Sequence, residues 1–181
     1  MNRIISVLTL FLLSFGSVAG DAPLDKPFSL GTGFYSSILD SDDFIDEIEF
    51  TGIAFSFGYA FTDQFAFRGT YFALEEVDIS ELESKGFDLN LYLGTGLASQ
   101  GVKAYVGGGL YKDKFSIGSN SESFSGLQLS GGVGYNWESI SIDFILNIRE
   151  TSDYEDFFNE GLPFDVDISA VSGALLLSLR F

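Results

Sequence analysis

The sequence predicts an all-β protein, an eight-stranded antiparallel up-and-down transmembrane β-barrel. Three observations support this fold class. Apolar and polar side chains alternate with a period of two in eight segments, which are separated by turn residues. An apolar run near the start of the chain has the form of an export signal. The composition combines 21 glycines and 20 phenylalanines with no cysteine, so the folded chain would be held together without disulfides.

Residues 1–20 are predicted to be a signal peptide, and residues 21–181 are predicted to form the barrel domain. Arg3 gives a positively charged start, an apolar run follows, and small residues lead to a cleavage site after Ala19 or Gly20. The apolar run is shorter than the roughly 20 residues that a helix needs to cross a bilayer. We therefore expect export of the chain rather than a helical anchor.

The alternation is clearest in four predicted strands. In residues 87–94, four large apolar side chains share one face, while Asp88, Asn90 and Tyr92 share the other. The other clear strands are 52–61, 126–137 and 140–149, and the less regular ones are 28–39, 65–74, 102–111 and 166–181. Most of these segments are close to the 9 to 11 residues with which a tilted strand crosses the hydrocarbon of a membrane.

The polarity of the two faces favours a membrane barrel over a soluble one. A soluble barrel of the lipocalin type places its large apolar side chains inside. Here the second face consists mainly of Gly, Ser, Asn and Asp, which are too small and polar for a soluble core, and the first would be a large apolar patch in water. Lipid covers that patch, and closure of the barrel pairs the backbone groups that an open sheet would leave unpaired in lipid. We therefore expect the apolar face outside and the polar face inside.

Short and long connections alternate along the predicted strands. The short ones are 62–64, 98–101 and 138–139, and the long ones are 40–47, 75–84, 112–122 and 150–164. In barrels of the bacterial outer membrane the short turns face the periplasm. The predicted location is therefore the bacterial outer membrane, with both termini periplasmic. An aromatic girdle is expected at the short turns from Phe61, Phe65, Tyr135, Trp137 and Phe181, and a second at the long loops from Tyr71 and Phe87.

The end of the chain resembles the C-terminal strand of bacterial outer-membrane barrels, which finishes with an aromatic residue. Leu175, Leu177, Leu179 and Phe181 match its alternating apolar positions. In that family the segment is the signal that the barrel-insertion machinery recognises. The whole mature chain is similar to the small eight-stranded barrels that include the OmpA transmembrane domain, OmpX and the porin-family outer-membrane proteins. The glycine-rich segment 104–110 and the inward-pointing Arg68 in 67–71 add to this resemblance.

Catalysis is not expected. Enzymatic barrels of this size, such as outer-membrane phospholipases and omptin-like proteases, depend on a histidine as general base or as a partner of the nucleophile. This chain has no histidine and no cysteine. We therefore assign no catalytic residue, no cofactor and no defined metal site.

The polar residues that should point into the lumen are the candidate functional residues. They are Arg68, Asp88, Asn90, Lys103, Gln128, Asn136, Asp143, Asn147, Arg149 and Arg180. One interpretation is a hydrogen-bonded and ion-paired plug, because eight strands leave a lumen that side chains just fill. The other is a narrow path for water or ions with gating salt bridges. Either way a buried charge needs a partner, and the sequence does not show which pairs form.

Acidic residues concentrate in the predicted outer loops. They include Asp40, Asp42, Asp43, Asp46, Glu75, Glu76, Asp153, Glu155 and Asp156. They could form a solvated acidic surface, or they could join the divalent cations that bridge lipopolysaccharide phosphates, since Ca²⁺ and Mg²⁺ prefer oxygen ligands. The spacing does not match an EF-hand loop. The net charge of −17 argues against nucleic acid as a partner.

The leading functional hypothesis is a structural outer-membrane protein of the bacterial envelope with a mostly plugged lumen. The first alternative is a small porin for ions or small solutes. The second is an OmpX-like surface adhesion or resistance factor that acts through the acidic outer loops. The expected partners are outer-membrane lipid, lipopolysaccharide and the barrel-insertion machinery, and the chain is expected to be a monomer.

Overall fold

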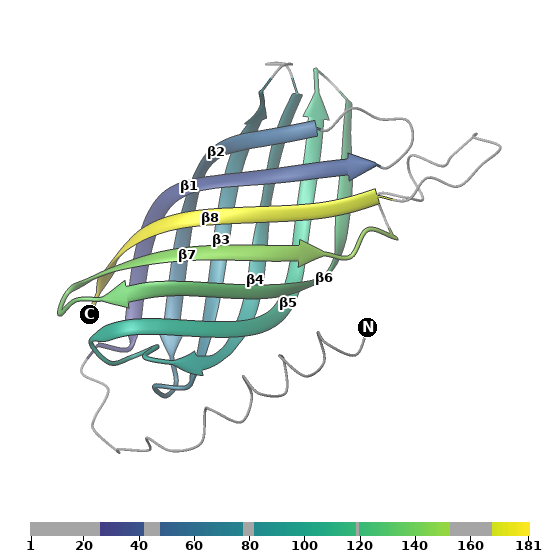
Figure 1. The fold of residues 1–181 in the computed structure, drawn as a ribbon. Coiled ribbons are helices and arrows are strands. Elements are labelled where there is room, and N and C mark those ends of the chain that lie inside the picture. The colour runs from purple at the N-terminus through teal and green to yellow at the C-terminus, as the bar shows by residue number, and fades with distance from the viewer. Residues whose placement is uncertain (1–25, 42–47, 78–81, 119, 153–167) are drawn as a thin grey trace, which may run out of the picture.

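The computed structural model describes residues 26–41, 48–77, 82–118, 120–152 and 168–181. They form a closed barrel in which the strands follow one another in chain order, as Figure 1 shows. The strands are β1 (Phe28–Ser41), β2 (Ile48–Ala60), β3 (Phe65–Glu76), β4 (Leu82–Thr95), β5 (Gly101–Ile117), β6 (Asn120–Asn136), β7 (Ile140–Arg149) and β8 (Ile168–Arg180). The predicted fold class is confirmed. The predicted signal peptide lies outside the described residues.

The barrel closes where β8 pairs with β1. Their antiparallel register runs from Ser29 opposite Arg180 to Ser41 opposite Ile168. Next to this ladder, the backbone N–H groups of Phe28 and Phe181 each donate to the other residue's carbonyl oxygen at 3.0 Å. Closure satisfies backbone groups that lipid could not satisfy. In the described part of the chain, no helix is long and apolar enough to span a membrane.

The two ends of the barrel differ in their connections. At one end, here called the turn end, residues 61–64, 96–100 and 137–139 join successive strands, and the C-terminus lies there as well (Figure 1). The opposite end, here called the loop end, holds the remaining connections. At the turn end the ring centroids of Phe61 and Phe65 lie 5.0 Å apart, and those of Tyr135 and Trp137 lie 4.7 Å apart. The aromatic residues predicted for this end therefore lie there.

The outer wall is apolar, as the alternation predicts. On β4, Leu89, Leu91 and Leu93 are 39%, 50% and 62% exposed, whereas Asp88 and Asn90 between them are almost completely buried. The same alternation holds along β2, β7 and β8. An apolar wall of this kind is stable in hydrocarbon and would be a large patch in water.

The interior is less polar than the sequence suggested. Large apolar and aromatic side chains are buried in the lumen beside the polar ones: Tyr35, Phe50, Phe72, Leu74, Tyr92, Tyr105, Tyr111, Phe124 and Leu176. The expectation of a small and polar inner face is therefore wrong in part. Where glycine leaves space on one strand, a ring from the next strand occupies it. A Cβ on Gly132, for example, would lie 2.6 Å from the ring of Tyr105.

Three predicted loops are longer than the connections in the structure, because they begin before the strand ends and two of them also end after the next strand begins. The expected loop 112–122 is mostly paired strand, because β5 and β6 extend to Ile117 opposite Asn120. Asp40, Glu75 and Glu76 lie in paired strand ends rather than in loops. The pairing continues because the backbone ladder does not require an apolar outer face once a strand has left the hydrocarbon. Glu76 also points inward and is buried.

Candidate functional site: the luminal polar network

The turn half of the lumen is organised around the carboxylate of Asp143, on β7. Its Oδ1 lies 3.1 Å from the guanidinium of Arg68 on β3, and its Oδ2 lies 2.8 Å from Nζ of Lys103 on β5. The hydroxyl of Tyr105 donates to Oδ1 at 2.7 Å and accepts from Arg68 at 3.1 Å. The guanidinium of Arg68 also lies 5.8 Å from the ring centroid of Tyr92, within cation–π range. We call these five residues the Asp143 cluster.

The loop half of the lumen is organised around Arg149, at the end of β7. Its guanidinium contacts Asp88 on β4 at 3.0 Å and Asp113 on β5 at 2.7 Å, and the three side chains are 0%, 2% and 1% exposed. The hydroxyl of Tyr35 on β1 accepts from Arg149 at 2.8 Å and donates to Asp88 at 2.6 Å. These groups therefore form one buried layer across the lumen.

Two further aromatic rings complete this layer. The guanidinium carbon of Arg149 lies 5.4 Å from the ring centroid of Phe72 and 4.7 Å from that of Tyr111. Phe72 stacks on Tyr35 with 4.5 Å between centroids. Charge-assisted hydrogen bonds and the two nearby rings hold the guanidinium in one orientation. We call Arg149, Asp88, Asp113, Tyr35, Phe72 and Tyr111 the Arg149 layer.

A chain of hydrogen bonds connects the two halves. Tyr92 bonds to Ser130 at 3.0 Å, and Ser130 donates to Asn147 at 2.5 Å. Asn147 then donates to Ser172 at 3.0 Å, and Ser172 bonds to Tyr35 at 2.9 Å. In parallel, the side-chain amide of Gln128 donates from Nε2 to the side-chain oxygen Oδ1 of Asn90 at 3.0 Å. Because each hydroxyl and amide binds a neighbour, the desolvation cost of burying them is offset.

The charges of the network balance overall but not locally. The Asp143 cluster holds two cations on one carboxylate, and the Arg149 layer holds two carboxylates on one cation. The interior thus has a positive side near the turns and a negative side near the loops. Removing Asp143 or Arg149 would leave two like charges buried without a counter-ion, which is strongly destabilising.

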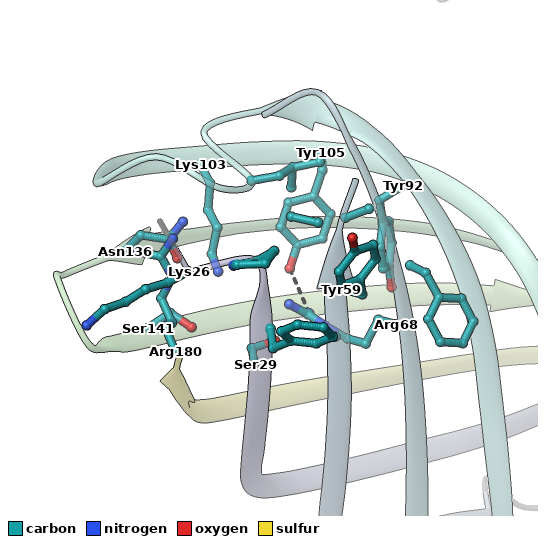
Figure 2. A pocket seen from close by; sticks show the side chains of 17 residues that line it. Lys26, Ser29, Tyr59, Arg68, Tyr92, Lys103, Tyr105, Asn136, Ser141 and Arg180 are labelled. Atoms are coloured by element: carbon teal, nitrogen blue, oxygen red, sulfur yellow. Dashed lines mark hydrogen bonds between the residues drawn. The ribbon is translucent and has the colours of Figure 1, made fainter. Parts of the chain in front are cut away.

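A small cavity of about 30 Å³ lies at the turn end of the lumen. Figure 2 shows Lys103 and Arg68 extending into this space from β5 and β3. Arg180 lines it too, and its guanidinium donates to the carbonyl oxygen of Trp137 at 2.8 Å and to that of Ala98. We call this cavity the vestibule.

The turns next to the vestibule are held by side chains. Asn136 donates to the carbonyl oxygens of Gly96 and Ser99 at 2.8 and 2.9 Å. Asp63 accepts from the backbone N–H groups of Gly96, Ala98 and Ser99 at 3.2, 3.1 and 2.8 Å. Partial burial by itself would raise the pKa of Asp63, but these donors favour its charged form and lower the pKa below the usual value. Together they tie two adjacent turns into one rim.

The structure brings most of the predicted lumen residues together. Eight of the ten take part in the two halves or the connections between them: Arg68, Asp88, Asn90, Lys103, Gln128, Asp143, Asn147 and Arg149. The other two, Asn136 and Arg180, point inward but bond to turn carbonyls instead. We did not predict Asp113. Tyr92 was placed correctly on the inner face, but the luminal tyrosines were not included among the candidate functional residues. Extending the alternation of β5 past Tyr111 would have placed Asp113 on the same face as Lys103.

The predicted C-terminal signal residues share the outer face of the barrel. Leu175, Leu177, Leu179 and Phe181 are all exposed on the wall, and Phe181 stacks on Phe28 with 5.8 Å between ring centroids. They therefore lie on or directly after β8, the strand that closes the barrel by pairing with β1.

The acidic residues predicted as cation ligands are only partly described. Asp42, Asp43, Asp46, Asp153, Glu155 and Asp156 lie outside the described residues. Among the residues that are described, no three side chains of the His, Cys, Asp or Glu type gather as a metal site would require. The cation hypothesis stays a prediction.

No family model matches the sequence, and no curated protein matches it. Solved structures do share its fold. Ail, the attachment invasion locus protein of Yersinia pestis, aligns with a TM-score of 0.56 and 18% identity over 86% of this chain and 99% of its own. Neisserial surface protein A aligns with a TM-score of 0.63 and 14% identity over 85% and 97%. The N-terminal barrel domain of Pseudomonas aeruginosa OprF aligns with a TM-score of 0.53 and 16% identity over 84% and 97%. The chain thus has the fold of the small eight-stranded outer-membrane barrels.

Proposed function

We propose that this chain is a structural protein of the bacterial outer membrane whose lumen is sealed to ions. The observation that carries this proposal is the Arg149 layer, in which a fully buried guanidinium is bound by two carboxylates and lies within cation–π distance of two rings. An ion that passed through would have to separate these charges, at a cost of several kcal/mol. Buried polar and aromatic side chains occupy most of the lumen.

The apolar wall and the fold support a place in the outer membrane, with lipid and lipopolysaccharide as its surroundings. The short turns and the C-terminus would face the periplasm, and the chain would act as a monomer. The exposed positions Leu175, Leu177, Leu179 and Phe181 would present the signal that the barrel-insertion machinery recognises. The lack of histidine and cysteine supports a role without catalysis.

Conductance of the refolded chain in a planar lipid bilayer tests the sealed lumen. We expect no stable current steps from the chain at neutral pH, while a general porin inserted under the same conditions conducts. Stable steps would contradict the proposal. They would favour the second candidate, a small porin, for which the hydrogen-bonded path from Tyr92 to Tyr35 is the supporting observation.

Lysines on the outer wall near the loop end support the proposal that the chain contacts anionic lipid headgroups. Lys85 lies directly opposite Lys114 and Phe87 directly opposite Lys112 in the β4–β5 ladder, so three cations follow the apolar wall. Binding of vesicles with and without lipopolysaccharide, compared for the chain and a Lys112→Gln/Lys114→Gln variant, tests this contact. Equal binding by both proteins would contradict it.

Adhesion through the loop end is the remaining alternative. β5 and β6 pair with one another as far as Ile117 and Asn120, whereas β7 pairs with β6 only from Gln128. The β5–β6 hairpin, which β4 accompanies as far as Ile117, therefore extends past β7 and would offer a surface for a partner on that side. Cell binding by the full chain and by a deletion of residues 153–162 tests the predicted role of the acidic loop. Unchanged binding would remove that loop from the hypothesis.

A further inference from the structure

The vestibule concentrates positive charge in an acidic protein. Lys26, Arg68, Lys103 and Arg180 all line it, as Figure 2 shows, whereas the chain as a whole has nine basic and 26 acidic residues. The residues that line the cavity include no carboxylate. Four of the nine cations of the chain therefore surround one small space.

Nearby carboxylates compensate only part of this charge. Asp143, behind the cavity wall, is shared between Arg68 and Lys103. The oxygens of Asp63 are occupied by backbone donors of the adjacent turn. Arg180 donates to carbonyl oxygens, and Lys26 donates to the hydroxyl of Ser139 at 2.7 Å. Within the described part of the chain, neither Lys26 nor Arg180 has a carboxylate at salt-bridge distance.

Such an excess of cations around one concave site attracts an anion. A concave site with walls of low dielectric focuses the field of its charges and raises the local concentration of counter-ions. The donors needed to bind an anion are present, since Lys103 has three N–H groups and Arg68 has five, of which the contacts with Asp143 and Tyr105 use only some.

The size of the cavity limits the ligand. Its volume of about 30 Å³ is space for about two water molecules on this measure. A monatomic anion fits this volume, whereas an organic anion such as gluconate does not. We propose that the vestibule binds a chloride-sized anion between Lys103 and Arg68. This site depends on neither the orientation of the barrel nor a sealed lumen.

Urea unfolding of the refolded chain in detergent micelles tests the site. The midpoint is measured in sodium chloride and in sodium gluconate at equal ionic strength. We expect chloride to raise the midpoint in a saturable way and gluconate not to do so, because only chloride binds to the folded state. An equal response to both salts would overturn the proposal, since it would show general screening.

Two variants locate the effect. Lys103→Gln removes one donor cation from the vestibule, and Glu122→Gln changes the net charge by one unit at an exposed position on the loop end of β6. We expect the chloride concentration for half the effect to rise about tenfold in Lys103→Gln, because a lost hydrogen bond to an ion weakens binding by about that factor. We expect it to stay unchanged in Glu122→Gln. An unchanged response in Lys103→Gln would place the anion elsewhere and overturn the proposal.

Direct observation does not depend on the folding of a variant. A crystal of the unaltered chain soaked in sodium bromide should show an anomalous peak in the vestibule, within hydrogen-bond distance of Lys103 Nζ and the Arg68 guanidinium. A peak in the vestibule with bromide would support the site. A derivative with bromide peaks elsewhere and none in the vestibule would overturn it.

Discussion

Substitution of Asp143 should destabilise the barrel more than substitution of its partners, because its carboxylate is the shared counter-ion of two cations. Its two oxygens bind Lys103 and Arg68, and one of them also accepts from Tyr105. The three partners come from β3 and β5, so a single carboxylate on β7 joins strands that are not adjacent around the barrel. No other described carboxylate contacts these two cations at salt-bridge distance.

Replacing Asp143 with Asn should therefore destabilise the barrel strongly. The amide keeps the shape but removes the charge, which leaves two buried cations without a counter-ion. We expect a loss of about 3 to 5 kcal/mol in the free energy of unfolding, measured by urea unfolding in micelles. Tyr105→Phe, which removes only the hydroxyl, should lose about 1 kcal/mol.

The control for this experiment is an ion pair in water. Glu83 contacts Lys85 at 2.5 Å on the exposed outer wall, so Glu83→Gln removes a carboxylate of the same kind from a hydrated site. Solvent screens such pairs, and the stability should barely change. A similar loss for Asp143→Asn and Glu83→Gln would show that burial of the cluster is not what makes Asp143 important.

Asp63 should make the turn end sensitive to acid. Its pKa is lowered in the folded state below the usual value of 3.8 because three backbone N–H groups stabilise its charged form more than partial burial opposes it. A group with a depressed folded pKa contributes stability above its unfolded pKa and loses that contribution as the pH falls through the folded value. Unfolding midpoints from pH 5 to pH 2 should therefore fall less steeply for Asp63→Asn than for the unaltered chain. Parallel profiles would contradict this role.

At the scale of the strand, the β5–β6 pair shows how glycine makes room for the luminal rings. Tyr105 on β5 lies directly opposite Gly132 on β6. Two ring carbons of Tyr105 and its hydroxyl oxygen lie 2.6 to 2.7 Å from the position that a Cβ on Gly132 would take. The ring cannot move aside cheaply, because its hydroxyl is bound to Asp143 and Arg68.

Gly132→Ala should consequently displace Tyr105 and weaken the Asp143 cluster. We expect a loss of about 1 to 3 kcal/mol, as for other overpacked cores. Gly131→Ala is the matched control, since the nearest atom to its new Cβ would lie 3.7 Å away and the methyl group would point outward. Equal stability of the two variants in the urea assay would mean that the ring can repack freely.

The strand faces could be predicted from the sequence, but the strand ends could not. Alternation assigns a side chain to one face by parity alone, which is why Asp88 and Leu89 were placed correctly. Beyond the membrane the outer face no longer needs to be apolar. Lys112 and Lys114 therefore resemble loop residues in the sequence although they lie outward in a paired strand.

The members of the site could be predicted better than their contacts. An inward charge in a closed barrel needs a partner, and this identified the carboxylates and cations of the lumen. Which of them meet depends on the register of all the strands between them. Arg149 on β7 reaches Asp88 on β4 and Tyr35 on β1 across the lumen, and no local pattern contains that information. Parity placed Tyr92 on the inner face, but the tyrosines were left out of the polar network because only charged and amide side chains were counted as its members.

At the scale of the whole molecule, the lumen holds two charged groups in series. The Asp143 cluster occupies the turn half with a net positive charge, and the Arg149 layer occupies the loop half with a net negative charge. Strands β3, β4, β5 and β7 contribute charged side chains to them. Under the proposed function each group acts as a seal, so an ion would have to pass both, and the tighter seal would set the conductance.

This arrangement predicts that the barrel stays non-conducting when only one of the two charged groups is removed. The triple variant Asp88→Ala/Asp113→Ala/Arg149→Ala removes all three charges of the Arg149 layer together, so that no buried charge is left unpaired. In a planar bilayer it should show no current steps while the Asp143 cluster is intact. Adding Arg68→Ala, Lys103→Ala and Asp143→Ala should produce stable steps, provided that the variant keeps the β-sheet circular dichroism and the heat-dependent gel migration of a folded barrel. Steps from the triple variant alone would show that the Asp143 cluster does not seal the lumen and that only the Arg149 layer prevents ion flow.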